Sequence, residues 1–375
     1  MSGIYIHIPF CKKACHYCNF HFSTQIEHIN DFVDALLKEM SLQQNYLHQP
    51  VQTIYFGGGT PSLLNEAQLH KILKAIDANF VSSPNIEITL EANPDDINIE
   101  KTKMWSSQGI NRLSIGIQSF QQEALNWMNR AHNTNQSHQS IENAIKAGIN
   151  NLSIDLIYGT PHLTNEALIN DIEILNTYQI PHVSCYALTV EEKTALHTLI
   201  KNKKIQDVDA NKQALHFEII VDQLEKNGFE HYEISNFAKP GHQSKHNSNY
   251  WKGVPYLGLG PSAHSYNVHS RQWNIANNIL YIQNINKGII PFEIENLETV
   301  TSYNEYMMIS LRLSAGVELE EIKNRFGDAY LSHTLKVKEQ FNHNGQLLNT
   351  QLGFTISKNA RFLADGIASD FFITP

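Results

Sequence analysis

Residues 3–20 read GIYIHIPFCKKACHYCNF, which sets a short apolar run directly before three cysteines. The run Ile4–Ile8 is rich in isoleucine, as expected of a buried parallel strand. Cys11, Cys15 and Cys18 follow with the spacing C-x₃-C-x₂-C. Thiolates are the ligands that iron–sulfur clusters prefer, and three of them leave one iron of a four-iron cluster open for another ligand. The stretch therefore predicts a strand that ends at a 4Fe-4S cluster.

Structural zinc is the alternative for the same cysteines. Zinc sites usually combine one C-x₂-C pair with a distant second pair, whereas the fourth cysteine of this chain, Cys185, stands alone. His16 and His21 are close enough in sequence to act as zinc ligands, so this alternative stays open. Spacing and context favour the cluster. For Cys185, inside a predicted strand, we expect a buried, inert thiol.

Strand-like runs alternate with helical patterns along the first half of the chain. After Ile4–Ile8, strands are predicted at Thr53–Phe56, Ile86–Leu90, Arg112–Ile117, Leu152–Ile157 and Val183–Leu188. Helical periodicity covers Ile29–Met40 and roughly 66–79, 99–108, 138–147 and 165–178. Such alternation predicts an α/β fold with a parallel sheet. Six units in a row favour a partial (β/α)₆ barrel, with a doubly wound sheet as the alternative.

The pattern changes after the sixth predicted strand. Ala210–Lys226 is another predicted helix, and we assign residues 1–235 to the barrel. The stretch from Phe229 to Pro261 is rich in Asn, Gly, Pro and aromatics, which predicts irregular backbone, and we assign residues 236–295 to an aromatic and Gly-rich segment packed on the barrel. Residues 296–375 are predicted to form a small C-terminal α+β domain. Its patterns are helical at Tyr303–Leu313 and Leu319–Phe326 and strand-like at Gln346–Leu348 and Gly353–Ile356.

Composition narrows the class of protein. Hydrophobic residues make up 42% of the chain and charged residues 17%, which is typical of a globular protein and not of a disordered one. The net charge of -9 argues against a nucleic-acid partner. The N-terminal sequence lacks the basic region of a signal peptide, and no apolar run approaches the length of a membrane span. We therefore expect a soluble, cytoplasmic protein.

Polar residues and glycines follow the predicted strands. In a β/α barrel the active site gathers at the carboxyl ends of the strands. These ends carry, in chain order, the cysteines, Gly57-Gly58-Gly59-Thr60, Glu91, Gln118, Asp155 and Tyr186-Ala187, with Arg130 beyond the fourth strand. Glycines let backbone approach a ligand closely, although a plain turn also explains them. Two carboxylates, an amide and a guanidinium suit a ligand with an amino group, a carboxylate and ribose hydroxyls.

Five motifs together resemble the oxygen-independent coproporphyrinogen oxidase family of radical S-adenosylmethionine proteins. They are IHIPFCKKACHYCNF, YFGGGTPS, LEANP, RLSIGIQSF and IDLIYGTP. The resemblance runs from Gly3 to about Tyr266, and more weakly beyond. It implies a partial barrel of six units with a 4Fe-4S cluster on the three cysteines. It also implies an S-adenosylmethionine site lined by Tyr5, Tyr17, Gly58, Gly59, Thr60, Glu91, Gln118, Arg130, Asp155 and Ala187.

Two local features separate the branches of this family. The oxidase branch has a fourth cysteine two residues after the third, whereas Phe20 stands there in this chain, as in the heme-chaperone branch. The string HNSNYW, from His246 to Trp251, resembles H-N-x-x-Y-W of the same branch. His246 is a candidate axial ligand of heme iron, and Tyr250 and Trp251 offer flat faces for a porphyrin. Ordinary core packing is the alternative for these three residues.

The resemblance thus predicts a heme chaperone, which binds heme and transfers it to a respiratory acceptor protein. The cluster and S-adenosylmethionine would serve as structural or regulatory parts. The first alternative is the oxidase itself, an enzyme that decarboxylates coproporphyrinogen III through a 5′-deoxyadenosyl radical. The second is a radical enzyme with an unrelated substrate. The resemblance also implies a homodimer, and it leaves peripheral membrane contact open, although no basic amphipathic helix indicates such contact.

Overall fold

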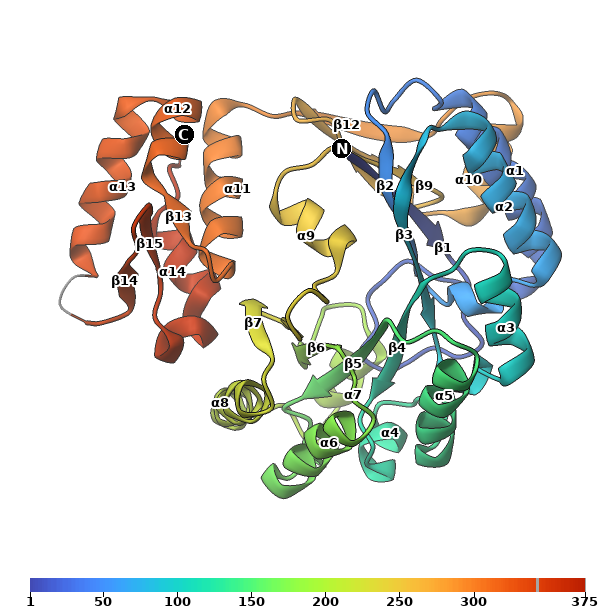
Figure 1. Cartoon of the computed structure of the whole chain (residues 1–375), viewed down its shortest axis with the longest axis horizontal. Helices are drawn as coiled ribbons and strands as arrows, with labels where there is room; N and C mark the ends of the chain where they lie inside the picture. Colours follow the sequence, from blue (N-terminus) through green and yellow to red (C-terminus); the bar gives the residue numbers. More distant parts are fainter. Residues whose placement is uncertain (342–343, 375) are drawn as a thin grey trace.

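The structure is a computed structural model that describes residues 1–341 and 344–374. Its largest element is a twelve-stranded sheet with the order β12-β11-β10-β9-β1-β2-β3-β4-β5-β6-β8-β7 (Figure 1). The central parallel strands are β1 (Ser2–Ile8), β2 (Val51–Gly58), β3 (Ser82–Ala92), β4 (Arg112–Gln118), β5 (Leu152–Tyr158) and β6 (His182–Ala187). All six predicted strands are therefore present, and the predicted α/β fold with a parallel sheet is confirmed.

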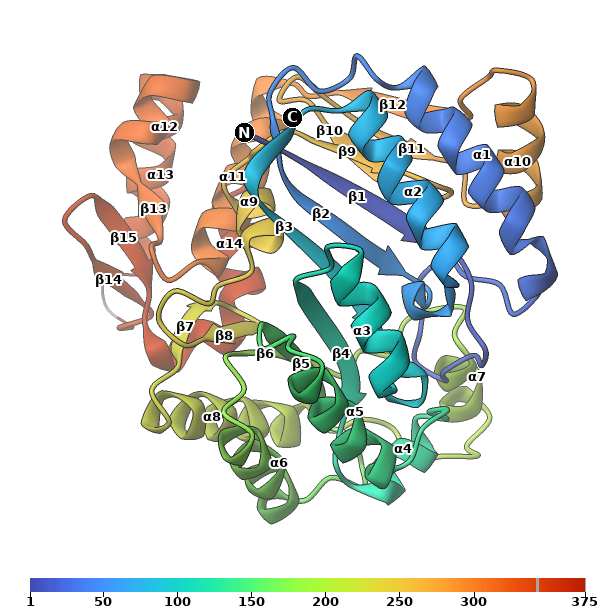
Figure 2. The ribbon, with the colours of Figure 1, turned by 45° about the vertical axis from the view of Figure 1, so that its right-hand side comes forward.

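Helices follow each of these strands, and most of them lie along the outer side of the sheet (Figure 2). They are α1 (Ile29–Leu42), α2 (Glu66–Asn79), α3 (Ile99–Ser107), α4 (Gln122–Trp127), α5 (Thr134–Lys146), α6 (Asn165–Thr177), α7 (Ala195–Lys201) and α8 (Ala210–Lys226). The short helices α4 and α7 have no counterpart in the sequence prediction. The strands β12 and β7 form the two edges of the described sheet, so the barrel is an open arc.

Alternation along the strands separates an apolar layer from a polar interior. In β1, Ile4, Ile6 and Ile8 are fully buried in the hydrophobic core. Tyr5 and His7 point to the opposite face, because successive side chains of a strand alternate. On this concave face the Tyr5 ring stacks on Tyr55 of β2, with ring centroids 6.2 Å apart. The helices pack on the apolar face, and the polar side chains of the concave face are available to line a binding site.

Residues 236–295, which include most of the stretch Phe229–Pro261 predicted to be irregular, form regular elements. They form β8 (Asn236–Ala238), α9 (Lys245–Trp251), β9 (Tyr256–Leu259), β10 (His264–Tyr266), β11 (Ser270–Asn274), α10 (Asn278–Asn286) and the start of β12 (Phe292–Asn296). The expectation of irregular backbone is corrected here, because β9 pairs in parallel with β1 and β10 to β12 continue the sheet. At the other edge, β8 pairs with β6 and with β7 (Glu230–Glu233). Strands of three to five residues carry too little periodicity to be recognised locally.

The C-terminal segment has its own sheet and its own core (Figure 1, left). Its elements are α11 (Thr299–Arg312), β13 (Val317–Glu318), α12 (Leu319–Phe326), α13 (Asp328–Gln340), β14 (Leu347–Asn349), β15 (Gly353–Ile356) and α14 (Ala364–Asp370). Tyr303, Met307, Phe354 and Phe371 are buried together in its core. Helix α13 is absent from the sequence prediction. Among the described residues, no helix is long and apolar enough to cross a membrane.

Candidate functional site

A cavity of about 330 Å³ lies at the carboxyl ends of the parallel strands. Its wall combines the loop that carries the three cysteines with the ends of β2 to β6. Of the predicted S-adenosylmethionine residues, those that line it are Tyr17, Gly58, Gly59, Thr60, Glu91, Gln118, Arg130, Asp155 and Ala187. Cys11, Cys15 and Cys18 line the same cavity. Residues scattered over the first half of the chain thus meet around one space.

Tyr5 is the predicted S-adenosylmethionine residue that does not line the cavity. Its hydroxyl lies 3.2 Å from Nδ1 of His7, and its ring packs against Gly57, where an added Cβ would come within 2.9 Å of it. Tyr5 therefore packs against the end of β2 without bordering the cavity.

The glycines of β2 are required by close packing of the strand end against β1. Gly58 has a φ of 101°, and a Cβ there would meet the His7 ring at 2.6 Å. A Cβ on Gly59 would meet the carbonyl oxygens of Phe10 and Ile8 at 2.7 and 2.8 Å. The space left by the missing side chains is thus filled by β1 and by the start of the cysteine loop. These glycines bring the second strand end against the residues that lead into the cysteines.

Two of the three thiols receive hydrogen bonds from the cavity wall. Thr60 Oγ1 donates to Cys11 Sγ at 3.3 Å, and Arg130 Nη1 donates to Cys15 Sγ at 3.3 Å. Desolvation raises the pKa of Cys11 to about 11, so a bare thiol there stays protonated at neutral pH. A bound metal centre deprotonates coordinating thiols, and hydrogen-bond donors stabilise the resulting thiolates. The donor set, three thiols with a hydroxyl and a guanidinium beside them, fits an iron–sulfur cluster.

The two histidines considered for zinc each hydrogen-bond through one ring nitrogen. His16 Nδ1 lies 2.9 Å from the carbonyl oxygen of Trp127, and His21 Nε2 lies 2.7 Å from Oδ1 of Asn278. Within residues 1–341 and 344–374, no three His, Cys, Asp or Glu side chains are grouped so that they could hold one metal ion. The preference for a cluster over zinc therefore rests on the cysteine spacing and on the donors beside the thiols.

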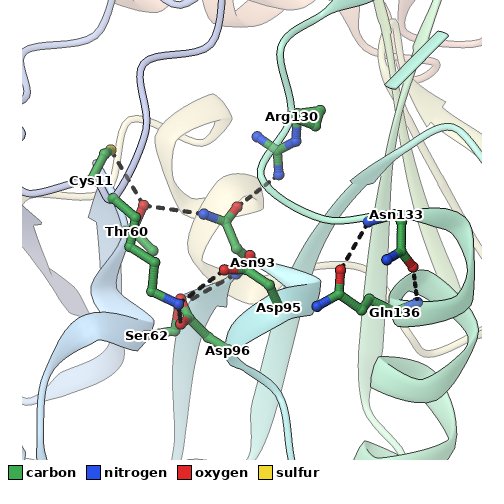
Figure 3. A network of polar contacts seen from close by, with 10 residues as sticks. Cys11, Thr60, Ser62, Asn93, Asp95, Asp96, Arg130, Asn133 and Gln136 are labelled. Atoms are coloured by element: carbon green, nitrogen blue, oxygen red, sulfur yellow. Dashed lines mark hydrogen bonds and ion pairs between the residues drawn. The ribbon is translucent and has the colours of Figure 1, made fainter. Parts of the chain in front are cut away.

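Ion pairs and hydrogen bonds tie the cysteine loop to the end of β3. Lys12 Nζ lies 2.9 Å from Oδ2 of Asp95 and also contacts Asp96, which is almost fully buried. Ser62 Oγ, at the end of β2, donates to the other oxygen of Asp96 at 2.7 Å (Figure 3). Asn93 joins the same network because its main-chain N–H donates to Ser62 Oγ at 3.4 Å, and its side chain contacts Thr60 and Arg130 (Figure 3). One connected set of polar contacts thus links the cysteine loop with the second, third and fourth strand ends.

A helix cap and a β-bulge place Arg130 and Gln118 in the cavity wall. Arg130 precedes α5, whose start is set by a capping box in which the side chains of Asn133 and Gln136 each bond the other's main chain (Figure 3). Gln118 ends β4 with a φ of 69°, after a register shift that begins at Ile115. A non-glycine residue in this conformation is uncommon and is found preferentially at functional sites. The bulge turns the Gln118 amide into the cavity wall.

Glu91 and Asp155 place two carboxyl groups in the wall. Glu91 Oε1 accepts a hydrogen bond from the Tyr55 hydroxyl at 2.8 Å, and Asp155 Oδ1 accepts one from Ser114 at 3.2 Å. Desolvation raises the pKa of Glu91 to about 7 and that of Asp155 to about 6. Each carboxylate would gain from a ligand that brings a positive charge or hydroxyl donors. This fits the amino and ribose groups expected of S-adenosylmethionine.

Several wall residues were not identified from the sequence: Asn93, Ser114, Gly116 and Phe22. Period-two alternation could have found three of them, because Asn93 follows Glu91 by two positions and Ser114 and Gly116 precede Gln118 by four and two. Phe22 follows the cysteines in a loop without regular structure, where no pattern indicates direction.

The HNSNYW string lies away from the cavity, at the opposite end of the sheet interior. His246 of α9 is 2% exposed, with Nδ1 2.8 Å from Thr53 Oγ1 and Nε2 2.8 Å from the Tyr250 hydroxyl. Both ring nitrogens thus have partners, and desolvation lowers the pKa of His246 to about 3. Tyr250 and Trp251 are half-buried. The structure therefore brings the predicted cluster residues and nine of the ten predicted S-adenosylmethionine residues together, and leaves the candidate heme residues apart from them.

Known proteins share both the motifs and the fold. The model of the Radical SAM superfamily matches residues 5–175. The heme chaperone HemW of Bacillus subtilis is 33% identical over 375 residues, which cover 99% of each chain. HemW of Escherichia coli is 34% identical over 268 residues, covering 70% of this chain and 69% of that protein.

A solved structure supports the same fold. Coproporphyrinogen III oxidase (HemN) from Escherichia coli, a radical SAM enzyme, superimposes with a TM-score of 0.86 over 99% of this chain and 89% of that one. At 22% sequence identity this likeness shows the fold alone. Similarity over nearly the full length of both chains goes further: the chain belongs to the family of the heme chaperone HemW within the radical SAM superfamily.

Proposed function

We propose that this protein is a heme chaperone that binds heme and hands it to an acceptor protein. The observation that carries the proposal is its similarity, over 99% of both chains, to a protein named as a heme chaperone. Phe20 agrees with it, since this position carries a cysteine in the oxidase branch that the sequence also resembles. The respiratory nature of the acceptor, a homodimer, peripheral membrane contact and a cytoplasmic location belong to the same proposal.

The cavity is proposed to hold a 4Fe-4S cluster and S-adenosylmethionine. Cys11, Cys15 and Cys18 would ligate the cluster, which supplies one-electron chemistry and an open iron when bound. Glu91 and Gln118 would address the methionine end or the ribose. Arg130 and Asp155 would meet the rest of the molecule. The support for these roles is that all of these side chains line one cavity.

Heme is proposed to contact α9 through His246, Tyr250 and Trp251. Ligation by His246 requires release of Thr53 or of Tyr250, because each ring nitrogen already has a partner. Among the described residues, α9 also carries three buried polar atoms without a hydrogen-bond partner: Ser248 Oγ, Asn249 Nδ2 and Trp251 Nε1. Unpaired buried polar groups are rare and costly, so their clustering supports α9 as an element that accepts a polar ligand group such as a propionate.

An anaerobic turnover assay separates the chaperone from the oxidase. The reconstituted protein is incubated with S-adenosylmethionine, reductant and coproporphyrinogen III, and protoporphyrinogen is measured beside a genuine oxidase. We expect no product from a protein whose cluster is intact, and saturable heme binding in a parallel titration. Product at a rate comparable to that of the control would contradict the proposal and make Phe20 an unimportant departure.

A further inference from the structure

A single amide bridges the two groups that donate to the cysteine thiols. Asn93 Nδ2 lies 3.3 Å from Thr60 Oγ1, and Asn93 Oδ1 lies 2.7 Å from Arg130 Nη2 (Figure 3). Thr60 in turn donates to Cys11, and Arg130 donates to Cys15. Asn93 is therefore the common partner of the donors to two of the three predicted cluster ligands, although it touches neither sulfur itself.

The chemistry of these groups determines which way the amide faces. A guanidinium has five N–H donors and no acceptor, so the atom of Asn93 that faces Arg130 must be the oxygen. The amide nitrogen then faces Thr60 and donates to its hydroxyl oxygen. A hydroxyl has one hydrogen that rotates freely, and an incoming N–H donor directs that hydrogen elsewhere. The other partner of Thr60 Oγ1 is Cys11 Sγ, so Asn93 orients the hydroxyl hydrogen toward the sulfur.

The same amide helps to fix the plane of Arg130. Nη2 donates both to Asn93 Oδ1 and to the carbonyl oxygen of Gly116, at 2.7 Å in each case. With this end of the guanidinium held, Nη1 faces Cys15 Sγ at 3.3 Å and the Tyr17 hydroxyl at 3.5 Å. Hydrogen bonds that are linked in this way strengthen one another in a medium of low polarity.

We propose that Asn93 is a positioning residue that raises the reduction potential of the cluster by orienting Thr60 and Arg130 toward the cysteine sulfurs. The inference rests on the proposed cluster site. Reduction adds negative charge to the cluster and its thiolates, and hydrogen-bond donors at the sulfurs stabilise that charge. Removing the amide leaves both donors in place but frees their orientation, so reduction becomes harder.

A redox titration followed by electron paramagnetic resonance tests this on the reconstituted full-length protein. Asn93→Leu removes both hydrogen bonds at similar volume, and Asn98→Leu is the matched control. Asn98 is exposed, caps α3 five residues further on, and contacts Lys101 and Thr102 of its own helix. We expect Asn93→Leu to lower the equilibrium constant for one-electron reduction about tenfold, or ~59 mV, with unchanged iron content. The control should keep the wild-type potential.

A double-mutant cycle with Thr60→Val shows whether Asn93 acts through its neighbour. Because part of the Asn93 effect passes through the hydroxyl, the double variant should shift the potential by less than the sum of the single shifts. If leucine prevents cluster assembly, Asn93→Ala takes its place. An unchanged potential in a fully loaded Asn93 variant, or strictly additive shifts, would overturn the inference. A wild-type protein that holds no iron would instead overturn the proposed cluster site, which iron analysis detects separately.

Discussion

The two ends of the sheet interior use buried polar side chains differently. At the carboxyl end, Glu91 and Asp155 border a cavity, and their pKa values are raised to about 7 and about 6 by desolvation. At the amino end, His246 of α9 has a partner on each ring nitrogen, and the Glu87 carboxylate accepts from the main-chain N–H groups that begin the same helix. Burial of titratable groups is common to both ends. The difference is that the Glu91 and Asp155 carboxyl groups face a cavity, which is why we propose the carboxyl end as the site of the cluster and S-adenosylmethionine.

Replacing one of the proposed cluster cysteines should have the largest effect of all the changes considered. We expect Cys15→Ser to lose nearly all bound iron and the visible absorption of the cluster, because two thiolates do not hold a cubane stably. Cys185→Ser is the control, since this cysteine is buried in β6 and lines no part of the cavity. Iron and sulfide analysis after anaerobic reconstitution is the measurement. Full iron retention in Cys15→Ser would break the assignment of the carboxyl end.

Sequence patterns predict the fold correctly where a strand contains a run of β-branched and other apolar residues and is followed in the chain by a helix. The six central strands satisfy this condition, and their ends are predicted within four residues. Strands β9 to β12 do not, because they are three to five residues long and join a sheet begun about 250 residues earlier. Their stability comes from pairing with distant segments, which local periodicity does not encode.

Prediction of the site follows the same division. The cysteines are recognised by their spacing, and Glu91 and Asp155 by their positions at the ends of predicted strands. The sequence assigns His246 to heme because its string resembles a motif, whereas one of its two hydrogen-bond partners, Thr53, is 193 residues away in the chain. A hydrogen bond over that separation becomes visible only when β2 and α9 meet. The sequence therefore predicts which residues line the cavity better than it predicts which polar groups already have hydrogen-bond partners in the fold.

The next largest effect is expected at the amino end, where His246→Ala removes both hydrogen bonds of the ring. We expect the free energy of unfolding to fall by about 1–3 kcal/mol, because the Thr53 and Tyr250 hydroxyls lose their partner in a buried place. Denaturant unfolding of the cluster-free protein measures this. Thr53→Val, which removes one of the two bonds, should cost less.

A heme titration of the same variant sharpens the comparison further. An unchanged heme affinity and Soret band in His246→Ala would assign this histidine to structure alone. Loss of a low-spin spectrum in His246→Ala, with retention in Thr53→Val, would make His246 a ligand that leaves its partners when heme binds.

A smaller effect is expected in the pH dependence of stability. The pKa of Glu91 rises from an ordinary value of 4.5 to about 7 on folding, so the folded protein binds more protons than the unfolded chain between these values. Stability from this group is therefore full below pH 4.5, falls as pH rises toward 7, and is constant above that. Glu91→Gln should flatten this part of the stability profile of the cluster-free protein, measured by urea unfolding from pH 5 to 8. An identical slope in both proteins would show that the Glu91 carboxyl titrates normally.

The smallest effect is expected from the ion pairs of Lys12, which join the cysteine loop to Asp95 and Asp96. The Lys12 side chain is 44% exposed, so Lys12→Met should lower the free energy of unfolding by only about 0.5–1 kcal/mol. Its clearer consequence should be faster loss of the cluster in air, because the loop then depends on main-chain bonds such as that from Cys11 to Ser23. Lys74→Met, at an exposed position of α2, is the control for loss of one charge. Equal rates of cluster decay in the two variants would show that these main-chain bonds alone hold the cysteines at the cavity.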